Sequence, residues 1–156
     1  MEMKVMKSKT GSKILIPKEI NGYPVIEQEI LTDTDRFTMV HNRIIDTKLL
    51  TVKEKTLYMV LKSFCYDTDV CIPSEKYLAY LSGCDEKTVR AYVRKLEKYN
   101  LICSVTLRSK GEIKTRKYYK MLPSSEWLLE PDNEIRAEWL KLSEEYEIVD
   151  EEKTGL

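Results

Sequence analysis

The feature that most constrains the fold is a pair of short helical patterns separated by a break. Ser74 can cap a helix that runs to Leu81, and the break that follows contains Gly83. Asp85 can cap a further helix over residues 86–99. Two helices joined by a turn of three or four residues that contains glycine are typical of a helix-turn-helix.

A longer helix is expected before this pair. Thr51 and Glu54 have the spacing of a capping box, and the pattern that follows runs to about Cys65. The residues expected on its buried face recur at helical spacing: Leu57, Leu61 and Phe64. Residues 37–45, just upstream, alternate only weakly between apolar and polar types.

A β-hairpin is expected after the pair. Residues 101–108 alternate, with Cys103, Val105 and Leu107 on one face, and residues 113–122 return as a second strand. Three helices followed by such a hairpin make a winged helix-turn-helix. The predicted fold class is therefore α+β, with a three-helix core, a β-hairpin wing, an N-terminal hairpin or arm and a C-terminal helix.

Charge divides the 156 residues into three parts, although the formal net charge of the whole chain is zero. The middle, residues 36–123, has 18 basic and 9 acidic side chains and is the predicted DNA-binding domain. The tail, residues 124–156, has 3 basic and 11 acidic side chains, and residues 1–35 form an almost balanced arm. A basic block of this kind favours a polyanionic partner, nucleic acid first and an acidic membrane surface second.

The two ends of the chain carry weaker patterns. Residues 1–13 lack a period and predict a loose arm, whereas two apolar runs around Asn21-Gly22 predict a hairpin. A helix is expected over residues 133–148. Its apolar side chains are spaced 4, 3, 4, 3, which indicates a short dimerisation seam made of Ile135, Trp139, Leu142, Tyr146 and Val149.

Several function classes lack their motifs. No window approaches 18 apolar residues, so no membrane span is expected, and no secretory signal is visible. The four cysteines form no C-x-x-C, and His41 is the single histidine, so we expect no metal site and a reducing, cytoplasmic location. No nucleophile elbow or P-loop is present; we assign no catalytic residue and no cofactor, and do not expect an enzyme.

The helix at residues 86–99 has one almost entirely basic face. On a helical wheel Val89, Val93 and Leu96 face the core, and the opposite side carries lysine and arginine around Ala91. A helix fits the major groove of DNA, where its N-terminal half meets base edges. The expected base-edge residues are Lys87, Thr88 and Arg90, and the expected phosphate contacts are Arg94, Lys95 and Lys98.

The hairpin at residues 108–117 adds a second group of cations. Arg116 and Lys114 are expected on one strand face and Lys117 on the other. The predicted contacts to the DNA backbone or minor groove are Arg108, Lys110, Lys114, Arg116 and Lys117. The alternative is an edge strand that lysines protect against aggregation.

A family resemblance rests on three segments, FTMVHNRIID, LTVKEKTLYMVLKSF and CIPSEKYLAYLSGCDEKTVRAYVRKLEKYNLI. Together they resemble the winged helix-turn-helix domain of phage and plasmid replication proteins over residues 37–122. Ala79, Gly83 and Val89 match the small residue, turn glycine and buried aliphatic of bacterial helix-turn-helix proteins. The chain departs from the family pattern at Asp85, where Ser or Thr is frequent, and at Asn100, where Gly is usual.

The resemblance implies DNA binding but does not separate replication initiators and replisome organisers from simple regulators. The leading hypothesis is a sequence-specific protein for double-stranded DNA, a homodimer, serving replication initiation or transcriptional regulation with a replication or transcription protein as partner. The alternative is a docking module that uses the winged helix and the acidic tail without specific DNA binding. The tail can also fold over the basic helix and mask it.

Overall fold

The computed structural model describes residues 3–7, 13–26, 37–65, 68–108, 111, 113–131, 134, 137 and 141. Within these residues the helices are α1 (Asn42–Asp46), α2 (Val52–Phe64), α3 (Glu75–Ser82), α4 (Glu86–Lys98) and the 3-10 turn η1 (Ser124–Glu126). The strands are β1 (Met3–Lys7), β2 (Lys13–Pro17), β3 (Glu19–Ile20), β4 (Tyr23–Pro24), β5 (Val70–Cys71), β6 (Ile102–Arg108) and β7 (Thr115–Met121).

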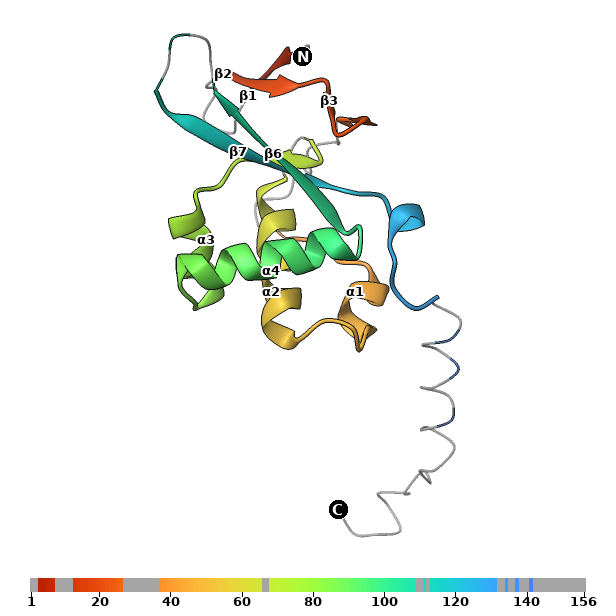
Figure 1. Ribbon diagram of the computed structural model, residues 1–156. Coiled ribbons are helices and arrows are strands. Elements are labelled where there is room, and N and C mark those ends of the chain that lie inside the picture. The colour runs from red at the N-terminus through yellow and green to blue at the C-terminus, as the bar shows by residue number, and fades with distance from the viewer. Residues whose placement is uncertain are drawn as a thin grey trace.

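A three-stranded antiparallel sheet, in the order β5-β7-β6, separates two layers. Helices α2, α3 and α4 lie on one side of it, and the N-terminal strands β1 to β3 lie on the other (Figure 1). Ile102, Tyr119 and Met121 belong to the core on the helical side, whereas Cys103 and Tyr118 pack with residues of the N-terminal strands. The sheet is therefore covered on both faces.

The predicted caps are confirmed. The Glu54 amide donates to the Thr51 hydroxyl at 3.3 Å, and the Thr51 amide donates to the Glu54 carboxylate at 2.7 Å, which completes the capping box of α2. Ser74 and Asp85 cap α3 and α4 in the same manner, each accepting from an amide three residues later. Such a cap stabilises a helix by about 1 kcal/mol.

The turn between α3 and α4 has three residues and begins at Gly83. Gly83 has φ +67°, in the left-handed region that only glycine adopts without cost, and it ends α3. Asn100, with φ +57°, follows the end of α4 as predicted. Leu57, Leu61, Val89, Val93 and Leu96 are buried in the helical core, so the predicted inward faces of α2 and α4 are confirmed. Phe64 is half-buried against the ring of Tyr77.

The β6–β7 hairpin is confirmed, with a register from Ile102 opposite Met121 to Arg108 opposite Thr115. Neither α1 nor β5 was predicted. The helix α1 occupies part of the weakly alternating stretch, where the imidazole of His41 accepts from the Arg43 amide and Ile44 is buried. The strand β5 has only two residues, too few to show a period, and is held by pairing with β7.

The N-terminal predictions are partly wrong. The Asn21-Gly22 hairpin exists, with both residues at positive φ, but β3 and β4 have two residues each. The prediction of a loose arm over residues 1–13 is wrong for residues 3–7, because β1 pairs with β2 from Met3 opposite Pro17 to Lys7 opposite Lys13. The lysines of this segment interrupt the apolar pattern by which a strand is predicted from sequence. The partner strand begins only six residues after the end of β1. Residues 1–2 and 8–12 lie outside the described residues.

After β7, the chain packs against the helical core. Trp127 and Leu129 are buried there, the indole of Trp127 donates to the Leu122 carbonyl at 3.0 Å, and the Leu128 amide donates to Tyr99 at 2.8 Å. Most of the expected helix over residues 133–148, with Ile135, Trp139, Leu142 and Tyr146, lies outside the described residues. None of the helices in the described ranges is long and apolar enough to cross a membrane.

Candidate nucleic-acid interface

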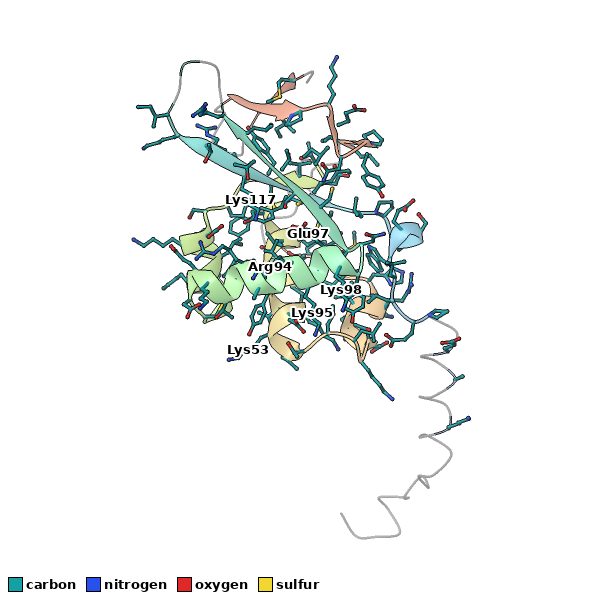
Figure 2. The ribbon with its side chains drawn as sticks, viewed as in Figure 1. Lys53, Arg94, Lys95, Glu97, Lys98 and Lys117 are labelled. Atoms are coloured by element: carbon teal, nitrogen blue, oxygen red, sulfur yellow. The ribbon has the colours of Figure 1, made fainter. Side chains whose placement is uncertain are left out.

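Helix α4 exposes a row of cations on the side opposite its buried residues. Its exposed side chains include Ala91 and four cations, which we call the α4 basic face: Lys87, Arg90, Arg94 and Lys98. Figure 2 shows Arg94, Lys95 and Lys98 along the part of α4 that is turned to the viewer. Because Ala91 is small, a neighbouring surface can approach the middle of this face closely.

The beginning of α4 is fixed by its cap. The Thr88 amide donates to the Asp85 carboxylate at 2.7 Å, and Thr88 itself is half-buried. Hydrogen bonds from the side chain and the backbone of Thr88 hold the pKa of Asp85 below its usual value. Lys87 is exposed one residue before Thr88. The first turn of α4 thus presents a cation beside two exposed acids, Asp85 and Glu86.

Two predicted DNA contacts are engaged in ion pairs. Arg90 Nη1 lies 3.2 Å from Glu75 Oε2, with side chains that are 50% and 28% exposed. Lys95 Nζ lies 3.0 Å from Glu54 Oε1, whose side chain is only 6% exposed. Burial alone would raise the pKa of Glu54, but the Thr51 amide and the Lys95 ammonium outweigh it and hold the pKa below its usual value. Lys95 therefore joins α4 to the capping box of α2.

The hairpin cations are divided between the two faces of the sheet. The register places Arg108 and Lys117 on the face of Tyr119, which is turned toward α4, and Arg116 on the opposite face. Lys117 Nζ lies 5.4 Å from the centre of the Tyr119 ring. Lys114 is exposed just before β7, and Lys110 lies outside the described residues. Lys117 and Arg108 are thus the hairpin cations on the sheet face that is turned toward the helices.

Sequence reasoning missed three charged residues around this surface. Glu97 accepts a hydrogen bond from the Ser104 hydroxyl at 2.8 Å and so ties α4 to β6. Glu75 partners Arg90, as described above. Lys53 is exposed on the first turn of α2, below Lys95 in the view of Figure 2. The capping box could have predicted that Lys53 is exposed. Glu54 turns inward to complete the box, so the residue before it lies on the outer side of the helix.

The cysteines act as packing groups in this fold. Cys65 and Cys71 are buried, and both thiols donate to the Leu61 carbonyl, at 3.5 and 3.4 Å. Burial raises the pKa of Cys71, which keeps it a thiol. Within the described ranges, no group of three or more His, Cys, Asp or Glu residues is placed to hold a metal ion.

Residues 48–102 match the model of a protein family described as a helix-turn-helix domain. The match extends from just before α2 through α3 and α4 to the first residue of β6, about a third of the chain. The match supports a helix-turn-helix domain in this part of the chain, a class that typically binds DNA. A search of curated proteins and a search of solved structures gave no significant match.

Proposed function

We propose that this protein binds double-stranded DNA sequence-specifically, with α4 as the recognition helix in the major groove. The observation that carries the proposal is the α4 basic face, which stands opposite a fully buried apolar face on the second helix of a helix-turn-helix. Lys87, Thr88 and Arg90 then meet base edges, since they lie in the first turns of the helix. Arg94 and Lys98 meet phosphates, and Lys95 contributes least, because Glu54 already pairs with it.

The β6–β7 hairpin serves as the wing in this proposal. Arg108 and Lys117 lie on the sheet face that is turned toward α4, so they extend the cationic surface beyond the helix. Lys110, Lys114 and Arg116 approach the DNA backbone from the tip and the opposite face. A winged helix-turn-helix docks in this way with its helix in one groove and its hairpin beside it.

The biological process in this proposal is replication initiation or transcriptional regulation of a phage- or plasmid-type element. In this proposal the protein is a homodimer through the seam that the sequence predicts at Ile135, Trp139, Leu142 and Tyr146, and the dimer would read two half-sites related by a two-fold axis. A replication or transcription protein would be the natural further partner. The resemblance of residues 37–122 to phage and plasmid replication proteins supports this context.

Selection of bound duplexes from a random pool by the full chain tests the proposal. We expect one enriched half-site, repeated with two-fold symmetry if the protein is a dimer. Titration of the selected duplex with salt should give a slope of log K against log salt near −5 if about six phosphates are contacted. No enrichment together with binding that ignores salt would favour the docking module that binds proteins without specific DNA recognition.

A further inference from the structure

We propose that Glu75 on α3 sets the base preference of α4 by positioning Arg90, without touching DNA itself. The inference rests on the proposed function and names a specificity determinant for it. Arg90 is the arginine of the first turns of α4, where a side chain meets base edges. The bidentate contact of an arginine with guanine depends strictly on the orientation of the guanidinium plane.

The ion pair leaves the recognition edge of Arg90 unoccupied. Nη1 of Arg90 lies 3.2 Å from Glu75 Oε2, and within the described part of the chain Glu75 is the hydrogen-bond and ion-pair partner of the guanidinium, whose charge also helps to lower the pKa of Asp85. An arginine carries five N–H donors in a fixed planar fork. With Nη1 held by the carboxylate, Nη2 and Nε stay available for the two acceptors of a guanine, O6 and N7.

The fold places Glu75 at the start of α3, within reach of Arg90 on α4. It is the first residue of α3, directly after Ser74, whose hydroxyl accepts from the Tyr77 amide at 3.1 Å. Its side chain is only 28% exposed. Burial raises the pKa of Tyr119 on β7, and the negative charge of Glu75 adds to that rise.

Substituting Glu75 should weaken the discrimination between base pairs without weakening the affinity for DNA in general. A free arginine side chain samples many rotamers, and a long, mobile cation can contact phosphates as easily as a base. The loss of the Glu75 charge also removes a repulsion of phosphates, which acts on every sequence alike. We therefore expect a variant at Glu75 to keep its affinity for DNA in general and to lose preference at one base pair.

The experiment compares full-length variants on the selected duplex and on duplexes with one base pair changed. Arg90→Ala first identifies the base pair whose discrimination depends on this arginine. At that base pair Glu75→Gln should lower the ratio of affinities, selected over changed, by about fivefold or more, the range that a bidentate contact supplies. The matched control is Glu126→Gln, which removes an exposed acid of η1, outside α4 and the hairpin. It should leave the ratio unchanged.

Glu75→Asp separates position from charge, because it keeps the carboxylate and shortens its reach by one methylene. We expect it to lower the ratio at the same base pair with the salt slope unchanged, while thermal unfolding verifies that each variant folds. If Arg90→Ala abolishes discrimination at one base pair and both Glu75 variants retain it, the positioning role is wrong and the proposed function stands. If the wild-type chain discriminates at no base pair, the proposed function itself fails.

Discussion

Lys120 and Asp69 form an ion pair inside the sheet, with side chains that are 1% and 9% exposed. Asp69 has further partners in the N-terminal segment: its carboxylate accepts from the Ile26 amide at 2.9 Å, and its own amide donates to the Ile26 carbonyl at 3.1 Å. The Met121 amide donates to the Asp69 carbonyl at 2.8 Å. One buried acid thus joins the N-terminal strands to β7, the second strand of the hairpin.

Lys120→Met should therefore lower the free energy of unfolding by about 3–5 kcal/mol, because it leaves the carboxylate of Asp69 buried without its counter-ion. Urea denaturation at pH 7 measures the change. Lys114→Met, which removes an exposed lysine just before β7, serves as the control and should cost little. The double variant Asp69→Asn with Lys120→Met removes both charges and should recover part of the loss. A cost below about 1 kcal/mol for Lys120→Met would show that the ion pair of Lys120 and Asp69 does not stabilise the fold.

Glu54 gives a pH dependence whose sign follows from its lowered pKa. A carboxyl whose pKa is lower in the folded state stabilises the fold above its unfolded pKa, about 4.3, and loses that contribution as the pH falls through the folded pKa. The difference in unfolding free energy between wild type and Glu54→Gln should be largest near pH 7 and shrink below about pH 4. Urea denaturation across this range tests it. Glu86→Gln, at an exposed acid, is the control. If the difference in unfolding free energy between wild type and Glu54→Gln were as large at pH 3 as at pH 7, the ionised Glu54 carboxylate would not be its source.

Arg43 anchors the segment that follows the hairpin. Its guanidinium donates to the carbonyls of Ser124, Leu129 and Glu130 at 3.0–3.3 Å and lies 5.5 Å from the centre of the Trp127 ring. No lysine can reproduce this fork. Arg43→Lys should cost about 1–3 kcal/mol of stability.

Hydrogen exchange gives the local readout for this substitution. The Leu128 amide, bonded to Tyr99 in the wild type, should exchange faster in Arg43→Lys, and Trp127 fluorescence should shift to the red. Arg116→Lys, at an exposed arginine of β7, is the control. Unchanged exchange at Leu128 in a destabilised Arg43→Lys protein would show that Arg43 does not anchor this segment.

The parts of the fold that sequence predicted are those set by short-range interactions. Thr51, Ser74 and Asp85 cap their helices by hydrogen bonds that span three residues, and Asn100 needs only its own backbone to stop α4. The alternation of buried and exposed residues along α2 and α4 could also be predicted, because each pattern lies within a single helix. By contrast, β5 is a strand because it pairs with β7. Two residues are too few to show a strand pattern, and the sequence does not indicate a pairing partner so far along the chain.

The same limit applies to the candidate site. A helical wheel placed Lys87, Arg94 and Lys98 on one exposed face of α4, because exposure follows from the period of the helix. It gave no information on Glu75 and Glu54, which come from α3 and α2 and reach α4 only in the folded chain. The division of the hairpin cations between two faces followed from strand alternation. Their position relative to α4 depends on the sheet packing over the helices.

Lys95 and Lys98 test whether the ion pair with Glu54 removes a cation from the DNA-binding surface. Lys98 is exposed, with its Nζ 5.5 Å from the centre of the Tyr99 ring, whereas Lys95 is tied to a buried carboxylate. Lys98→Ala should reduce the magnitude of the salt slope by about 1 and barely change stability. Lys95→Ala should change the slope less and cost about 1–3 kcal/mol of stability, because it leaves Glu54 without its charged partner. Salt titrations of DNA binding and urea denaturation of both variants measure the two effects. Equal slopes with equal stabilities would mean that Lys95 contacts phosphate as fully as Lys98, and that Glu54 releases it when DNA binds.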